Sequence, residues 1–159
     1  MARCTSRRKE RRLRRGVSTS WSASRSASAS RYRSPASVIY FDLNGFKGIN
    51  DRHGHAAGDA VLIAVAERLL AAVRAEDVVG RIGGDEFAVL LQRADAPTAT
   101  AKAESLREII ARDEVHFQQQ CVSIGVTYGV RQVGTADSAE QALAEADANM
   151  YLRKPRRKA

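Results

Sequence analysis

The chain has few cysteines, and their positions exclude both a disulfide framework and a thiolate metal site. Cys4 and Cys121 lie far apart in 159 residues, without the close spacings of disulfide-rich or zinc-binding domains. Cys121 belongs to an apolar stretch that predicts a strand, so we expect its thiol to be buried in the core. Nothing in this cysteine usage opposes a reducing compartment, and we expect a cytoplasmic protein.

No apolar run is long enough to cross a membrane. The longest, Ala60–Val73, is interrupted by Glu67 and Arg68 and falls short of the roughly 20 apolar residues that a spanning helix needs. The adjacent Arg7 and Arg8 are not followed by an apolar segment, which argues against a secretory signal. We therefore expect no membrane span in this chain.

Acidic residues are almost missing from the N-terminal part. Residues 1–33 carry eleven Lys/Arg and one acid, a net charge of +10, whereas residues 34–159 carry fifteen Lys/Arg and seventeen acids, a net charge of −2. Serine occupies every second position from Ser18 to Ser30, with little apolar content between. We predict that residues 1–30 form a disordered basic tail, although such a composition also resembles an organellar transit peptide. Because the charge is confined to the ends of the chain, we expect no specific nucleic-acid partner.

Hydrophobic periodicity in the remainder predicts alternating strands and helices. The expected strands are residues 37–41, 78–82, 86–91 and 120–130, and the expected helical segments are 45–51, 60–73, 97–111 and 138–152. Asp59 and Ser138 are predicted N-caps, and Gln141 is placed for a capping box. A hairpin combined with helical crossovers predicts an α+β fold, with a mostly antiparallel central sheet flanked by helices.

The turn Gly83-Gly84-Asp85-Glu86 allows two interpretations. Gly-Gly suits the positive φ angles of a tight hairpin, and acids are soluble at its tip. Alternatively, the glycines admit a ligand close to the backbone and the adjacent carboxylates bind a hard cation. Asp42 ends the first predicted strand, which can lie beside this hairpin, so three carboxylates would meet at one end of the sheet. Oxygen ligands without His or Cys suit Mg²⁺ or Mn²⁺, as in phosphoryl or nucleotidyl transfer.

Four motifs resemble those of the GGDEF domain, the diguanylate cyclase family. In matching order and spacing they are YFDLNGFKGINDRHGHAAGDAVL, VVGRIGGDEFAVLL, VSIGVTYG and ADANMYLRK, within residues 31–158. The resemblance implies a fold similar to nucleotidyl cyclases and polymerase palms. It also implies a homodimer that condenses two GTP into cyclic di-GMP and pyrophosphate and is inhibited by its product.

The resemblance also implies where the cofactor and the catalytic groups lie. Asp42 and the backbone carbonyl of Leu43 match metal-binding positions of the family. Asp85 and Glu86 match positions associated with metal binding and with activation of the attacking 3′-hydroxyl. The implied cofactor is Mg²⁺ or Mn²⁺.

A further set of residues matches contacts to the GTP substrate. Its members are Asn50, Asp59, Lys47, Gly83, Gly84, Lys154 and Lys158. Asn50 and Asp59 match guanine contacts, which suits an amide and a carboxylate, although Asp59 equally suits a helix cap. Lys47 and Lys154 match phosphate contacts. Lys158 stands where the family usually has Arg, so it lacks the planar fork for a phosphate, and a solvated basic C-terminus explains it equally well.

Arg74 and Asp77 match an R-x-x-D site at which members of the family bind their product. Five residues separate Asp77 from Gly83, which is the family's spacing. An Arg can form paired hydrogen bonds with guanine O6 and N7, and an Asp can accept from guanine donors. The alternative is an Arg at a helix end and a polar Asp in a loop.

The chain departs from the family at both ends. Members carry a D-x-L-T-G-L-x-N-R segment ahead of the first strand, which residues 1–30 lack, and a last strand usually follows the point where this chain stops. We expect residues 31–159 to be a GGDEF catalytic domain shortened at both ends. We hypothesise that a reading-frame slip or a mis-assigned start produced the N-terminal segment.

Three functional classes follow from the sequence. They are a metal-dependent diguanylate cyclase, a catalytically impaired GGDEF domain that binds GTP or cyclic di-GMP as a regulatory module, and a nucleic-acid binder acting through the tail. Acids at all three metal positions, Asp42, Asp85 and Glu86, favour the first class, because a receptor has no need of them.

Overall fold

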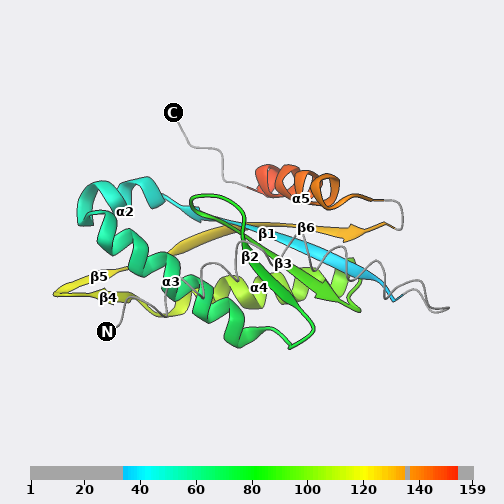
Figure 1. Ribbon diagram of the computed structural model, residues 1–159, viewed down its shortest axis with the longest axis horizontal. Helices are drawn as coiled ribbons and strands as arrows, with labels where there is room; N and C mark the ends of the chain where they lie inside the picture. Colours follow the sequence, from blue (N-terminus) through cyan, green and yellow to red (C-terminus); the bar gives the residue numbers. More distant parts are fainter. Residues whose placement is uncertain (1–33, 135–136, 154–159) are drawn as a thin grey trace.

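The computed structural model describes residues 34–134 and 137–153, which contain both strands and helices (Figure 1). In chain order they are β1 (Ala36–Asn44), α2 (Phe46–His53), α3 (His55–Ala72), β2 (Val78–Arg81), β3 (Glu86–Gln92), α4 (Ala96–Arg112), β4 (Val115–Phe117), β5 (Gln120–Val122), β6 (Gly125–Val133) and α5 (Ala139–Arg153). The predicted tail, Cys4, Lys154 and Lys158 lie outside the described residues.

The main sheet has four strands in the order β2-β3-β1-β6. Strand β1 is central and pairs with β3 on one side and β6 on the other, and β2 pairs with the outer side of β3. Every pairing in this sheet is antiparallel, which confirms the predicted α+β fold with a mostly antiparallel sheet. Among the described residues, no helix combines the length and the apolar character that crossing a bilayer requires.

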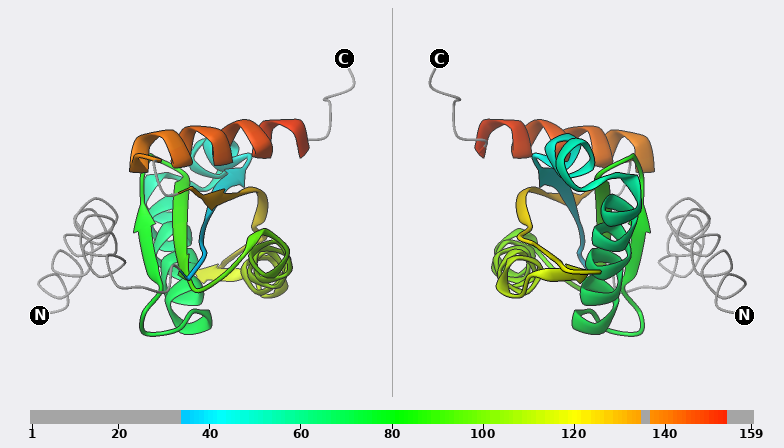
Figure 2. Two further views of the ribbon diagram at one scale, coloured as in Figure 1. Left: turned by 90° about the vertical axis from the view of Figure 1, so that its right-hand side faces the viewer. Right: turned by 90° about the vertical axis from the view of Figure 1, so that its left-hand side faces the viewer.

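The two faces of the sheet are covered by different helices, because side chains along a strand alternate between faces. Ile39, Phe41 and Leu43 of β1 belong to a core that includes residues of α3 and α4. Val38 and Tyr40 belong to a second core with residues of α5. Figure 2 shows α5 across one face of the sheet and α3 and α4 on the other. Since Asp42 has the parity of Tyr40, the α5 side is where its carboxylate lies.

Helix α5 approaches the sheet closely because β6 has a glycine beneath it. A Cβ at Gly129 would lie 2.8 Å from the Cβ of Met150 and would overlap backbone atoms of Ala146 and Met150. Contacts under 3.0 Å to a helix backbone cannot be relieved by rotating a side chain. Gly129 therefore determines how near α5 lies to the β1–β6 pair.

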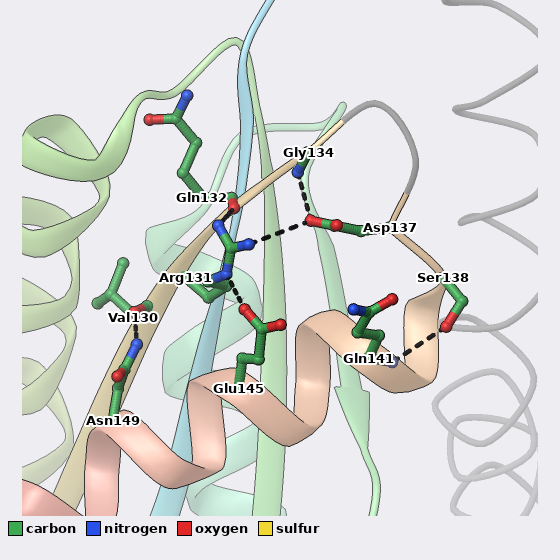
Figure 3. A network of polar contacts seen from close by, with 9 residues as sticks. All are labelled: Val130, Arg131, Gln132, Gly134, Asp137, Ser138, Gln141, Glu145 and Asn149. Carbon is green, nitrogen blue, oxygen red and sulfur yellow. Dashed lines mark hydrogen bonds and ion pairs between the residues drawn. The ribbon is translucent and has the colours of Figure 1, made fainter.

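Polar contacts at the edge of β6 hold α5 in this position (Figure 3). Arg131 forms an ion pair with Glu145 of α5 and a second one, at 3.5 Å, with Asp137 in the connection before the helix. The side-chain amide of Asn149 donates to the Val130 carbonyl at 2.9 Å. Ser138 Oγ accepts from the Gln141 amide at 3.1 Å, so its prediction as an N-cap is confirmed.

The prediction that Asp59 caps a helix is wrong. Helix α3 begins at His55, and Asp59 lies inside its second turn. Gly54, with φ 84° and ψ 160°, separates α2 from α3, and its carbonyl accepts from the amides of Ala57 and Gly58. The chain therefore enters the helix through a glycine conformation, which makes a side-chain cap at residue 59 unnecessary.

The single strand predicted at 120–130 is also wrong. The structure has β5 and β6 there, interrupted at residues 123–124, and β5 pairs with β4, which the sequence analysis missed. Gln118, at φ 53°, lies in the turn of this small hairpin. Because the hairpin stands apart from the main sheet, Cys121 is exposed and not buried as predicted, and its Sγ lies 3.3 Å from Nδ1 of His116.

Candidate active site

The pairing of β1 with β3 brings the predicted acidic residues to one end of the sheet. Strand β1 continues to Asn44, so Asp42 lies within the strand and not at its end, as the sequence had suggested. It stands directly opposite Glu86 in the antiparallel register. Opposed side chains share a face, with Cβ atoms about 4.5–5.5 Å apart. The next backbone contact, from the Leu43 amide to the Asp85 carbonyl at 3.1 Å, extends the ladder to the hairpin tip.

The donor atoms here suit a hard divalent cation. Asp42 and Glu86 supply carboxylates, and the carbonyl of Leu43 points toward the hairpin, because the N–H and C=O of a strand residue point toward the same neighbour. Oxygen-only donors of this kind favour Mg²⁺ or Mn²⁺. No three His, Cys, Asp or Glu side chains in the described ranges are grouped closely enough to hold a metal. The strand register therefore supplies a facing pair of carboxylates, with Asp85 beside it.

The hairpin tip is held by its own backbone and by one arginine. The Glu86 carbonyl accepts from the amides of Ile82 at 3.0 Å and Gly83 at 3.4 Å. Arg81 turns back over the tip, where Nε donates to the Gly83 carbonyl at 3.0 Å and Nη2 to the Gly84 carbonyl at 2.8 Å. The sequence analysis missed Arg81, whose position just before the two glycines was the available indication.

The two glycines of the turn are not there for a left-handed backbone, so the turn-chemistry interpretation is wrong in that respect. Positive φ values occur at other glycines of the described chain, and neither Gly83 nor Gly84 has one. At Gly83 the reason for glycine is space. A Cβ there would lie 2.9 Å from the carboxyl carbon of Glu86 and would overlap its Oε2. The Glu86 carboxylate thus lies directly against the Gly83 backbone.

Tyr40 lies on the same face of the sheet as Asp42 and was missed by the sequence analysis. It is only 8% exposed, and it pairs with Ala88, which shares a face of β3 with Glu86. Burial raises the pKa of Tyr40 well above its ordinary value, with further contributions from the neighbouring Glu86 carboxylate and from the charges of Asp147 and Asp42. The hydroxyl therefore stays protonated. The sequence indicated this position, because residues two apart in a strand, such as Tyr40 and Asp42, lie on the same face of the sheet.

The predicted guanine contacts lie on the two neighbouring helices, Asn50 on α2 and Asp59 on α3. Asn50 is half-buried, and its side chain lies against Gly58, where a Cβ would be 2.9 Å from the amide carbon of Asn50. Asp59 follows directly on α3 and is exposed, as is Lys47 on α2. The absence of a side chain at Gly58 thus lets the Asn50 amide lie against α3, one residue before Asp59.

The predicted product site lies in the loop between α3 and β2. Asp77 Oδ2 accepts from the Arg74 amide and Oδ1 from the Gln92 amide, both at 3.0 Å. Arg74 is exposed. The pKa of Glu76 is lowered, chiefly by a backbone hydrogen bond and also by the charges of Arg93 and Arg74. Asp77 therefore shapes the loop through two backbone contacts, and a carboxylate retains further lone pairs for a ligand.

Comparison with known proteins agrees with this fold and hairpin. A family model described as "Diguanylate cyclase, GGDEF domain" matches residues 14–159. A structure of a sensory box/GGDEF family protein from Caulobacter crescentus aligns with a TM-score of 0.77 at 35% identity, over 87% of this chain and 89% of that one. The fold and the acidic hairpin define a palm-like domain of the nucleotidyl cyclase kind. The chain belongs to the GGDEF family.

Two curated relatives come from Pseudomonas aeruginosa. The bifunctional diguanylate cyclase/cyclic di-GMP phosphodiesterase MucR is 38% identical over 115 residues, which are 72% of this chain and 17% of the relative. The diguanylate cyclase TpbB is 41% identical over 133 residues, which are 79% of this chain and 29% of the relative. The chain thus spans less than a third of the length of either relative.

Proposed function

We propose that the chain is a diguanylate cyclase, which condenses two GTP into cyclic di-GMP and two pyrophosphates. The observation that carries the proposal is the register of β1 and β3, in which Asp42 faces Glu86 beside Asp85. In each half-reaction the 3′-oxygen of one GTP bonds to the α-phosphorus of the other, and the bond to the leaving pyrophosphate breaks. A reaction that consumes GTP suits a cytoplasmic protein.

The carboxylates have two tasks in this proposal. Asp42, Asp85, Glu86 and the Leu43 carbonyl would hold Mg²⁺ or Mn²⁺, which neutralises charge on the triphosphate when bound. Asp85 and Glu86 activate the 3′-hydroxyl, whose proton a carboxylate oxygen accepts. The hydrogen bond from the Leu43 amide to the Asp85 carbonyl supports this proposal, because it joins β1, which bears Asp42, to the hairpin that bears Asp85 and Glu86.

The remaining residues bind the nucleotide. Asn50 and Asp59 recognise guanine, and the packing of Asn50 against Gly58, which directly precedes Asp59, supports a shared base site. The backbone of Gly83 and Gly84 lies under the nucleotide. Phosphate contacts come from Lys47, which is exposed on α2, and from Lys154 and Lys158, which lie outside the described residues.

Two further features belong to the proposal. One domain holds one GTP, and the symmetric product needs two antiparallel nucleotides, so the active species is a two-fold homodimer. The specific rate should then rise with chain concentration, and a concentration-independent rate from a monomer would contradict the dimer. Cyclic di-GMP binds at Arg74 and Asp77 and inhibits, a role that suits the exposed guanidinium of Arg74.

Synthesis of cyclic di-GMP by the purified chain with GTP and Mg²⁺ tests the proposal. We expect product with the wild-type chain and a loss of at least about 100-fold in Asp42→Asn and Glu86→Gln, because the main electrostatic stabilisation is removed. Glu108→Gln is the matched control, since Glu108 is exposed on α4 and should retain the wild-type rate. A wild-type chain without product, or an active Glu86→Gln variant, would contradict the proposal.

A further inference from the structure

We propose that Arg93 is a second arginine of the product site, where it binds a phosphate group of cyclic di-GMP beside Arg74. The inference rests on the function proposed above and adds a residue that the R-x-x-D motif does not contain. Arg93 directly follows β3. Its guanidinium reaches the loop between α3 and β2, where Nη2 donates to Oε1 of Glu76 at 3.2 Å.

One carboxylate joins the two segments that carry the arginines. Asp77 Oδ2 accepts from the Arg74 amide, and Oδ1 accepts from the amide of Gln92, the residue before Arg93, each at 3.0 Å. The Asp77 amide donates in turn to the Arg74 carbonyl at 3.1 Å. Both segments are therefore hydrogen-bonded to a single carboxyl group, which places the two arginines close to each other in a loop of fixed shape.

The backbone at Arg93 is held in a conformation that arginine seldom adopts. Its φ is 52°, in the left-handed region that favours glycine. The Gln92 amide is fixed on one side. On the other, the Ala94 amide donates to the Pro35 carbonyl and the Ala94 carbonyl accepts from Ser37 Oγ, both at 2.9 Å. Such strain persists where the surroundings fix it and is found at ligand sites, so a long cationic side chain at this position suits a binding role.

The ion pair of Arg93 can be exchanged for a ligand. The side chains of Arg93 and Glu76 are 68% and 38% exposed, and an exposed ion pair contributes little to stability. A phosphate offers a guanidinium two oxygens at once and forms paired, charge-assisted hydrogen bonds with it. The anionic phosphodiester groups of cyclic di-GMP would otherwise meet the acids Glu76 and Asp77, so two arginines suit this ligand better than one.

Calorimetric titration of the chain with cyclic di-GMP tests the role of Arg93 without catalysis. Arg93→Gln should weaken binding by about 10-fold or more, because hydrogen bonds between charged groups are lost. Arg93→Lys keeps the charge without the planar fork, so its affinity should lie between those of Arg93→Gln and the wild-type chain.

Arg112→Gln is the matched control. Arg112 is 73% exposed and forms an ion pair with Asp113 at 3.1 Å, so its loss resembles that at Arg93. It ends the 17-residue helix α4, about 25 Å from the start of the helix, which lies three residues after Arg93. The Arg112→Gln chain should bind cyclic di-GMP like the wild type.

Glu76→Gln separates ligand binding from a structural role of the ion pair. If the pair only shaped the loop, Glu76→Gln would weaken binding as much as Arg93→Gln does. A phosphate contact predicts the opposite, because the substitution releases the Arg93 guanidinium and removes a charge that repels the ligand. The Glu76→Gln chain should therefore bind at least as tightly as the wild type, and both variants should keep the wild-type melting temperature.

Several results would overturn the role of Arg93. They are wild-type affinity in Arg93→Gln or in Arg93→Lys, equal weakening in Arg93→Gln and Arg112→Gln or in Arg93→Gln and Glu76→Gln, a large fall in the melting temperature of Arg93→Gln, and a wild-type chain that does not bind cyclic di-GMP. If the wild-type chain binds cyclic di-GMP through Arg93 but makes none from GTP, the proposed activity fails and the role of Arg93 stands. Synthesis without product binding would be the reverse case.

Discussion

Replacing Gly83 with alanine should remove activity and leave the fold intact. The new methyl would lie 1.9 Å from Oε2 of Glu86 and 2.9 Å from its carboxyl carbon, whereas ordinary contacts are 3.4–4 Å, so the carboxylate oxygen must move by about 1.5–2 Å. Displacement of a reacting group by about 1 Å can lower the rate about 100-fold, and we expect a loss of at least about 100-fold in kcat. The displaced atoms are the end of a flexible side chain, so the free energy of unfolding should change by less than about 1 kcal/mol.

The assay compares initial rates of cyclic di-GMP synthesis with urea unfolding of the same preparations. Gly48→Ala is the control, because nothing lies within 4 Å of a Cβ there and the position is inside α2. That variant should keep the wild-type rate and gain roughly 0.5–1 kcal/mol of stability, since alanine favours a helix more than glycine does. Wild-type turnover in a folded Gly83→Ala chain would refute the argument that space at Gly83 places Glu86.

Four other substitutions test separate parts of the structure. Gly129→Ala would overlap the backbone of α5 and should lower the free energy of unfolding by about 1–3 kcal/mol or more; an unchanged urea midpoint would show that α5 is not in close contact there. The pKa of Tyr40 is raised in the folded chain. The protonated hydroxyl therefore stabilises the fold fully below about pH 10, where the tyrosine of the unfolded chain begins to titrate. Above that pH this stabilisation declines by up to about 1.4 kcal/mol per pH unit. Tyr40→Phe should therefore lose stability less steeply than wild type between pH 9 and 11 in urea titrations, and parallel curves would oppose this. Arg74→Ala should raise the final yield of cyclic di-GMP in progress curves while the initial rate stays the same, and product binding equal to wild type in calorimetry would remove the site. Asn50→Ala should raise the KM for GTP about 10-fold, the effect of one lost hydrogen bond to guanine, and a wild-type KM would exclude Asn50 from base recognition.

Most of the fold could be predicted because its determinants are local. Short apolar runs, the first rich in β-branched and aromatic residues, identified the strands predicted at 37–41 and 86–91, and Ser138 marked the start of the last helix. The wrong predictions concern segments that could pair with more than one neighbouring strand. The apolar run from 120 to 130 does not show that its first three residues pair with β4 and leave the main sheet, because pairing depends on a distant partner.

In the candidate site, too, some residues could be predicted from the sequence and others could not. The predicted strands placed Asp42 near the Gly83–Glu86 turn, and the resemblance to the GGDEF family supplied the roles expected of Asp42, Asp85 and Glu86. They did not indicate Arg81 or Tyr40. The bonds of Arg81 to the turn carbonyls and the place of Tyr40 opposite Ala88 are known only when the hairpin has folded back and β1 has paired with it.

The sequence by itself determined the kinds of elements, the antiparallel character of the sheet and the family, because periodicity and motif spacing are properties of short segments. Only the tertiary structure decided that Asp42 faces Glu86 in the ladder, that Gly83 makes room for a carboxylate and is not a left-handed turn residue, and that Tyr40 is buried beneath α5 on the face of Asp42. The physical reason is that strand register and helix docking are set by packing between segments far apart in the chain, and side-chain contacts follow from them.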